Sequence, residues 1–247
     1  MSYLIEDPIT PVMTPVRKRL PLRLVLLLFS LPAGEAQAVD APPSATATQV
    51  PILFLQKSGT PSSESFARLV TPFPELLSFS VCYRIRLARF REESTLMSYA
   101  LSDDLDNVMR MDHRMTGYKV SLHSKWATTK LKTPLRSWTH FCFTFDQGTG
   151  EWRIYLNGER REEGSFSGVT VTVDSGGAYI IGQEQDSLGG GFHRDQSFSG
   201  EITELNFWGQ VLDDYTIMQI AACEVEQEGD VLSWTQMSWK LEGEVQW

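Results

Sequence analysis

The chain has 247 residues and is acidic, with 22 Lys and Arg against 31 Asp and Glu, a formal net charge of −9 and a pI near 5.0. Because phosphate binding depends on an excess of Lys and Arg, this balance excludes nucleic acid and anionic membranes as partners attracted by bulk charge. Hydrophobic residues make up 42% of the chain and there are three cysteines, so it can bury a sizeable core but cannot be a disulfide-dense miniature scaffold.

The first 38 residues have the pattern of a secretory signal peptide. Basic residues at 17–23 precede the apolar run 24–31, and Ala36-Gln37-Ala38 offers the small residues that a signal peptidase reads. A helix of this apolar run would span only about 12 Å, against roughly 30 Å of hydrocarbon, so we expect no transmembrane anchor. We therefore expect a secreted protein with a signal peptide at 1–38, a Pro-, Ala- and Thr-rich linker at 39–50 and a folded domain at 51–247.

The folded part alternates apolar and polar residues in short runs, which is typical of half-buried strands. A tight hairpin is expected at Asn157-Gly158, and a short helix at 212–222, which opens with two aspartates. Many short strands separated by turn residues predict an all-β, two-sheet antiparallel sandwich with one short helix. The clearest strands are expected at 78–87, 139–145, 152–156, 169–173, 177–182 and 201–208.

Two of the three cysteines, Cys82 and Cys142, fall in predicted strands. In a secreted protein this pair favours a disulfide, which would contribute about 4 kcal/mol by constraining the unfolded chain; the alternative is two buried thiols. Cys223 ends the predicted helix and is either a buried thiol or part of an interchain bridge, and the sequence leaves both open.

Segment 182–197, GQEQDSLGGGFHRDQS, gathers oxygen donors around a glycine-rich turn. Glu184 and Asp186 lie two residues apart and project from one side of an extended chain, while the carbonyl of Gln185 turns the other way. Calcium takes about six to eight oxygen ligands, so this segment suits it chemically. A solvated acidic turn is the alternative interpretation.

These residues resemble the calcium loop of the pentraxins, the family of C-reactive protein and serum amyloid P component. The similarity extends over nearly all of 51–247, and it implies a jelly-roll sandwich of the lectin (concanavalin-like) type. The other matching motifs are Cys82, Met97-Ser98-Tyr99-Ala100, Asp106-Asn107, His140-x-Cys142, Gly200-Glu201-Ile202, Asn206-Phe207-Trp208 and Gly243-Glu244-Val245.

The resemblance implies two calcium ions per protomer, which coordinate the phosphate or carboxylate of a ligand directly. Metal charge would then supply the attraction to anions that the net charge of the chain lacks. The implied ligands of the first ion are Asp106, Asn107, Glu184, the carbonyl of Gln185 and Asp186, and those of the second ion are Glu184, Asp186 and Gln196.

Two departures from the family bear on this site. His193 stands where C-reactive protein has a glutamate, and a nitrogen donor suits a hard cation poorly. We therefore expect a weaker second site, unless Asp195 supplies the carboxylate, and further weakening as His193 protonates below about pH 6.5. Asp112 stands where C-reactive protein has an aromatic residue that packs on choline methyls, so phosphoethanolamine, acidic sugars and microbial polysaccharide join phosphocholine as candidate ligands.

Two other functions are compatible with parts of the sequence. Glu201-Ile202-Thr203-Glu204 is superficially similar to the acidic strand of β-sandwich glycoside hydrolases. In a regular strand Glu201 and Glu204 point to opposite faces, and the histidines lack zinc spacing, so we expect no enzyme. A laminin-G-like adhesion module is the second alternative, and calcium chelation would leave its adhesion at least partly intact.

The sequence therefore predicts a secreted, calcium-dependent pattern-recognition lectin of innate immunity. It would bind phosphorylated or acidic groups on microbial or damaged-cell surfaces. The resemblance also implies a closed homo-oligomeric ring, commonly a pentamer, in which multivalency strengthens binding by about 10²–10⁴-fold without new contacts.

Overall fold

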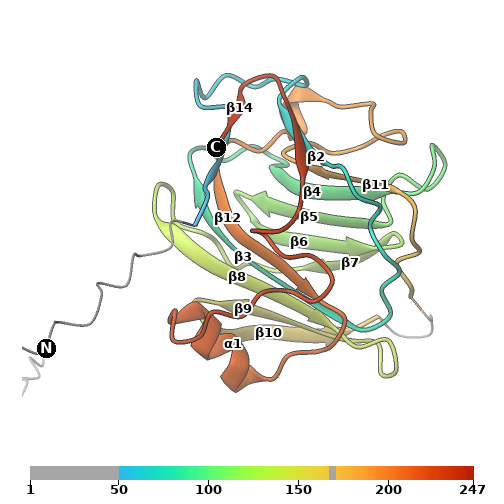
Figure 1. The fold of residues 1–247 in the computed structure, drawn as a ribbon, viewed down its shortest axis with the longest axis vertical. Coiled ribbons are helices and arrows are strands. Elements are labelled where there is room, and N and C mark those ends of the chain that lie inside the picture. The colour runs from blue at the N-terminus through green and yellow to red at the C-terminus, as the bar shows by residue number, and fades with distance from the viewer. Residues whose placement is uncertain (1–49, 167–170) are drawn as a thin grey trace, which may run out of the picture. The chain divides into compact units, whose positions relative to one another are not determined.

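The computed structural model describes residues 50–166 and 171–247, and these form a sandwich of two antiparallel sheets with seven strands each (Figure 1). The predicted signal peptide, and all of the predicted linker except Val50, lie outside the described residues. Among the described residues, no helix is long and apolar enough to cross a membrane. The predicted two-sheet, all-β architecture is confirmed.

The first sheet, sheet A, has the order β10-β9-β8-β3-β12-β1-β14. The strands expected at 78–87, 139–145, 152–156 and 201–208 are confirmed. Asn157 (φ 51°) and Gly158 (φ 84°) form the expected tight turn between β9 and β10, where positive φ is required at both positions. The strands are β1 (Leu53–Leu55), β3 (Phe79–Leu87), β8 (Trp138–Phe145), β9 (Glu151–Leu156), β10 (Glu159–Ser165), β12 (Gly200–Trp208) and β14 (Val245–Gln246).

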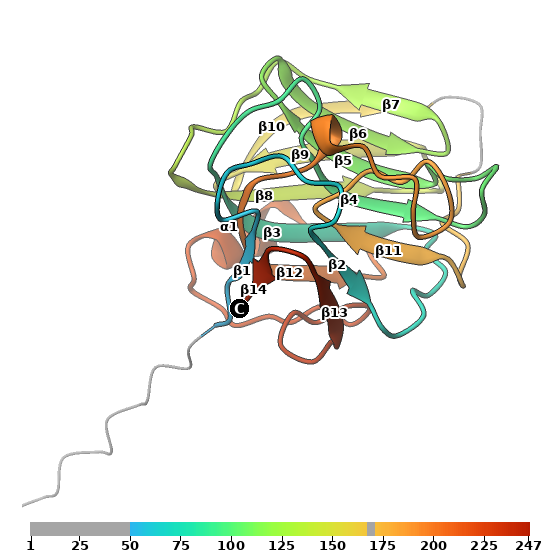
Figure 2. The same cartoon turned by 90° about the horizontal axis from the view of Figure 1, so that it is seen from above.

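The second sheet, sheet B, has the order β13-β2-β11-β4-β5-β6-β7, and Figure 2 shows its strands lying over those of sheet A. The strand expected at 177–182 is confirmed. Of the strand expected at 169–173, residues 169–170 lie outside the described part, and Val173 forms only an isolated bridge with Leu76. The strands are β2 (Phe66–Leu69), β4 (Thr95–Ala100), β5 (Met109–Arg114), β6 (Gly117–Leu122), β7 (Lys125–Thr128), β11 (Ala178–Ile181) and β13 (Trp239–Glu242).

The core between the sheets is rich in aromatic side chains. Phe73 packs against Tyr179 of sheet B at 5.1 Å between ring centroids and against Phe207 of sheet A at 5.3 Å. All three rings are buried. Burial of a side chain of this size contributes about 1.5–3 kcal/mol, so these contacts hold the two sheets face to face.

The one α-helix of the described residues, α1 (Asp214–Ala221), covers the outer face of sheet A and confirms the helix expected at 212–222. Asp213 caps it by accepting a hydrogen bond from the Thr216 amide at 2.8 Å. Ile217 and Ile220 are buried in an apolar cluster on this face, which also contains both strand cysteines.

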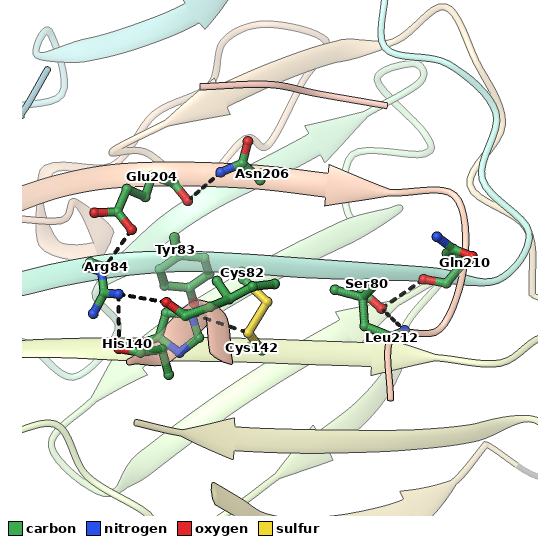
Figure 3. The surroundings of a disulfide bond; sticks show 12 residues. Ser80, Cys82, Tyr83, Arg84, His140, Cys142, Glu204, Asn206, Gln210 and Leu212 are labelled. Carbon is green, nitrogen blue, oxygen red and sulfur yellow. Dashed lines mark hydrogen bonds and ion pairs between the residues drawn. A yellow bond between two sulfur atoms is a disulfide. The ribbon is translucent and has the colours of Figure 1, made fainter. Parts of the chain in front are cut away.

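Beneath α1, Cys82 of β3 and Cys142 of β8 are direct cross-strand partners and form a disulfide (Figure 3). The predicted bridge is confirmed. Cys223 is free and exposed, so the interpretation of this residue as a buried thiol is wrong. Its Sγ lies 3.0 Å from the guanidinium of Arg84.

The two acids of β12 do not point to opposite faces, so that expectation is wrong. Glu204 has φ 54°, and the register of β12 against β3 shifts between Thr203 and Asn206. This bulge returns Glu204 to the side of Glu201. Glu201 pairs with Arg86 and Glu204 with Arg84, two arginines on the same face of β3. Each acid therefore forms an ion pair and the two are not coupled as a catalytic pair.

Candidate functional site

The predicted calcium loop follows β11 and folds back over the outer face of β4 toward the loop between β4 and β5. Ser98 of β4 donates a hydrogen bond to the carbonyl of Gln183 at 2.8 Å. Further along, the Leu188 amide donates to Oδ1 of Asp103 at 2.9 Å. These bonds fasten segment 182–188 to the β4–β5 loop, which carries Asp106 and Asn107. The fold thus brings together two motifs that are far apart in the sequence.

Several oxygens at this meeting point have no hydrogen-bond partner although they are buried. Asn107 donates from Nδ2 to Oδ1 of Asp106 at 2.8 Å, which leaves Oδ1 of Asn107 unpartnered. Oε2 of Glu184 and Oε1 of Gln196 are unpartnered too. Buried polar atoms are nearly always hydrogen-bonded, so three free acceptors in predicted metal ligands fit a bound cation.

Gln185 is fixed by its side chain. The Nε2 amide donates to Ser98 Oγ and to the carbonyl of Ala178, each at 3.1 Å, and Oε1 accepts from the Gly189 amide at 2.8 Å. With the side chain occupied in holding the loop, the main-chain carbonyl is the oxygen that Gln185 can offer a metal, as the resemblance implies.

The carboxylates of the two loops lie close enough to perturb one another. Burial raises the pKa of the Glu184 carboxyl to about 7. The neighbouring charges of Asp186, Asp112 and Asp106 contribute to this rise, and Arg110 opposes it. A carboxylate that resists ionisation without a metal gains a strong partner when a divalent cation binds, so the site is suited electrostatically to calcium.

Arg110 of β5 is the main feature that the sequence motifs missed. It is 5% exposed and its side chain lies among three carboxylates. Its nitrogens lie 2.8 Å from Asp112, 2.6 Å from Glu93 and 3.1 Å from Glu184. The available signal was the alternation MRMDHR in β5, which places its charged residues on one face and its methionines on the other.

Glu93 links this arginine to the end of the calcium loop. Its Oε2 accepts hydrogen bonds from Arg110 and, at 3.1 Å, from Nε2 of Gln196. Arg114 lies 3.4 Å and Lys119 4.0 Å from its other oxygen. Although partial burial opposes the change, the bonds from Arg110 and Gln196 hold the pKa of Glu93 at about 2.

The remaining predicted ligands lie at the exposed side of the loop. Nε2 of His193 is 3.4 Å from the Asp186 carboxylate, and the His193 side chain is 71% exposed. Asp195 lies in the single-turn 3₁₀-helix η1 (Arg194–Gln196), exposed and 3.8 Å from Nε of Arg194. The role of Asp195 as a substitute carboxylate stays a prediction.

Two hollows in the described part of the chain bear on the binding site. The smaller, of about 120 Å³, is lined by Asp106, Asn107 and His123. The larger, of about 270 Å³, lies near the end of α1 and is lined by residues that include His140 and Cys223. Because it is remote from the calcium loop in the fold, size alone does not identify the binding site.

Comparison with known proteins decides the family. The chain matches the Pentaxin family over residues 55–247. It belongs to the pentraxins. Pentraxins are binding proteins rather than enzymes, and the family generally binds calcium.

The relatives of this pentraxin include neuronal and invertebrate members. It is 29% identical to neuronal pentraxin-2 of Cavia porcellus over 169 residues, which cover 68% of the chain and 40% of that protein. It is also 29% identical to C-reactive protein 1.4 of Limulus polyphemus over 185 residues, covering 70% of the chain and 76% of that protein. The chain thus spans about two fifths of the length of the neuronal pentraxins that it matches.

Solved structures agree with the fold. The native heptameric SAP-like pentraxin of Limulus polyphemus is similar with a TM-score of 0.68 and 25% identity, covering 78% of this chain and 92% of that one. The extracellular region of zebrafish Gpr126 has a TM-score of 0.62 at 16% identity, covering 79% of this chain and 26% of that one, and shares the fold alone.

Proposed function

We propose that this pentraxin is a secreted, calcium-dependent receptor for phosphate or carboxylate groups on microbial or damaged-cell surfaces. The observation that carries the proposal is the set of buried, unpartnered oxygens on Asn107 and Glu184, beside the carboxylates of Asp106 and Asp186. A calcium ion bound there would give an acidic surface a local positive charge, and that charge would bind an anion directly.

The ligand side of the site favours small acidic groups over choline. Asp112 does not project into solvent, because its side chain is fully buried and bonded to Arg110 and Thr95. It therefore offers neither an aromatic wall nor a free carboxylate to a quaternary ammonium. On the neighbouring strand β6, Lys119 is the cross-strand partner of Asp112; it lies 3.4 Å above the exposed ring of Trp126 and presents a further cation. We expect phosphoethanolamine or acidic sugars to bind more tightly than phosphocholine.

Assembly in a closed ring is part of the proposal. The heptamer of the Limulus relative supports it, and the ring would align the calcium loops of all protomers on one side. Such a ring strengthens weak single-site binding by about 10²–10⁴-fold. The ring size of this protein, commonly five in the family, is to be measured by analytical ultracentrifugation.

The decisive experiment is calorimetric titration of the metal-free protein with calcium, followed by binding to an array of phospho-ligands and glycans. The variants Glu184→Gln and Asp186→Asn should each lower calcium affinity at least tenfold and abolish binding to the array. Glu163→Gln, an exposed acid on β10, is the matched control and should change neither. Array binding that survives chelation of calcium would contradict the proposal and favour the adhesion-module alternative.

A further inference from the structure

The position of Arg110 bears on how many metal ions the site holds. Each of its three guanidinium nitrogens contacts a different carboxylate, on Asp112, Glu93 and Glu184. The guanidinium group of an arginine keeps its positive charge at any physiological pH. A buried arginine held in this way is a fixed cation inside the site and not a mobile surface side chain.

Arg110 contacts the residues that the second calcium ion would need. Its Nη1 lies 3.1 Å from Oε1 of Glu184, which leaves Oε2 as the only unpartnered oxygen of that carboxylate. Its Nη2 contacts the same oxygen of Glu93 that accepts the hydrogen bond of Gln196. The guanidinium therefore links Glu184 to Gln196 through Glu93, where the second ion would otherwise draw the two ligands together.

The donors that remain are too few for a second calcium ion. Calcium takes about six to eight oxygens, and the fourth member of this set, His193, offers a nitrogen and is turned to Asp186. Asp186 and the free oxygen of Glu184 would be shared with the first ion, which leaves Oε1 of Gln196 as the one unshared, unpartnered oxygen of this set. A second divalent ion would also be repelled by the positive charge of Arg110 at contact distance.

Charge balance points the same way. The formal charges of the Arg110 cluster cancel, and among the predicted ligands of the first ion the carboxylates outside this cluster are Asp106 and Asp186, whose two charges match one divalent ion. The members of the cluster are the three acids Glu93, Asp112 and Glu184 and the three bases Arg110, Arg114 and Lys119.

We propose that the Arg110 guanidinium takes the place of the second calcium ion, so that each protomer binds one calcium beside a fixed organic cation. The inference rests on the first calcium site proposed above. It assigns the loss of the second ion to an arginine on β5 and not to the His193 substitution.

The test is calcium stoichiometry, measured by isothermal titration calorimetry on the full chain. The unmodified protein should bind one calcium per protomer, and Arg110→Met should bind two, because Glu184 and Gln196 are released. Arg114→Met is the matched control: it also removes a cation from Glu93 but none from Glu184, and it should still bind one.

A second variant does not depend on whether Arg110→Met folds. His193 is exposed, so His193→Glu should fold and restores a carboxylate to the loop. If Arg110 excludes the second ion, His193→Glu alone still binds one calcium. Two ions bound by His193→Glu would overturn the inference and assign the loss to His193.

The outcomes for the unmodified protein separate the two proposals. Two calcium ions per protomer would overturn the inference about Arg110 and leave the proposed function intact. No calcium bound at all would overturn the proposed function, and the inference with it. One ion in the unmodified protein and in Arg110→Met alike would also overturn the inference, because Arg110 would then not be what excludes the second ion.

Discussion

The outer faces of the two sheets differ in the kind of side chains that they bury. On sheet B, Arg110 and its carboxylates form a buried ionic cluster next to the calcium loop. On sheet A, a disulfide and the apolar side of α1 form a patch in which the cysteines are joined covalently. Loss of one member of a buried ionic cluster leaves an uncompensated charge, whereas loss of a side chain from the apolar patch leaves none.

This difference between the two faces indicates which part of the fold should gain stability when calcium binds. A region whose carboxylates require a cation gains free energy of folding when calcium binds, because anything that binds only the folded state stabilises it. The stability of the patch beneath α1 should not change when calcium binds. Changes made in the patch can therefore test the fold while calcium binding serves as an independent readout.

The largest effect is expected from removal of the disulfide. Cys82→Ala with Cys142→Ala should lower the free energy of unfolding by about 4 kcal/mol, because the bridge closes a long loop in the unfolded chain. Urea unfolding monitored by tryptophan fluorescence measures it. The calcium stoichiometry of the folded double variant should be unchanged. A loss under about 1 kcal/mol would show that packing against α1 alone holds the patch together.

Arg84 should have the next largest effect. Its guanidinium lies 2.8 Å from Glu204 and donates to the carbonyls of Ile220 and Ala221 at 2.9 and 3.0 Å, which fixes the end of α1 to β3. Arg84→Gln should cost about 1.5–3 kcal/mol, the range for hydrogen bonds to charged groups. Arg86→Gln, whose side chain is more exposed, should cost less than about 1 kcal/mol. Equal losses in urea unfolding would contradict the comparison.

Stability should fall in mild acid because of two buried histidines. Burial lowers the pKa of His113 and of His140 to about 3, from an ordinary value of 6.5. The unfolded chain therefore takes up protons below pH 6.5 that the folded chain takes up only near pH 3. Each ring should lower the free energy of unfolding by up to about 1.4 kcal/mol per pH unit below 6.5, and neither contributes above it.

Urea unfolding at several pH values between 7.5 and 5 checks this slope. His140→Gln should remove one ring's share, and the difference between the two slopes cancels the contribution of every other group. An unchanged slope in His140→Gln would show that the ring titrates in the folded protein as it does in the unfolded chain.

The smallest effect is expected at the start of α1. Asp213 accepts hydrogen bonds from the amide and the hydroxyl of Thr216, at 2.8 and 2.9 Å. Asp213→Ala should lower the melting temperature slightly but measurably, because the helix loses its cap. Asp213→Ser keeps an oxygen acceptor and should recover most of the loss. If the melting temperature of Asp213→Ser stays as low as that of Asp213→Ala, the charge and not the hydrogen bond matters at this position.

The sequence predicts those parts of the fold whose residues repeat with a clear period. The strands at 78–87 and 201–208 alternate strongly, and the Asn157-Gly158 turn is specified locally. The bulge at Glu204 could not be predicted from the sequence, because it depends on how β12 pairs with β3 and not on the composition of β12.

The candidate site divides in the same way. Its ligands in Asp106-Asn107 and 182–186 are contiguous and match a motif. Arg110 and Glu93 come from separate elements, and only the antiparallel pairing of β4 with β5 places them together. A cation that enters the site from a neighbouring strand leaves no motif, so the number of metal ions could not be read from the calcium loop alone.

The last two strands of the sandwich, β13 and β14, affect how the domain folds during synthesis. Segment 239–246 forms an edge strand of sheet B with β13 and an edge strand of sheet A with β14, and Trp234 packs against Trp239 and Trp247 at 6.0 and 5.3 Å. The edge of β2 in sheet B and the edge of β1 in sheet A therefore stay unpaired until this segment has left the ribosome. A nascent chain stopped before residue 239 should expose these two edges to chaperones.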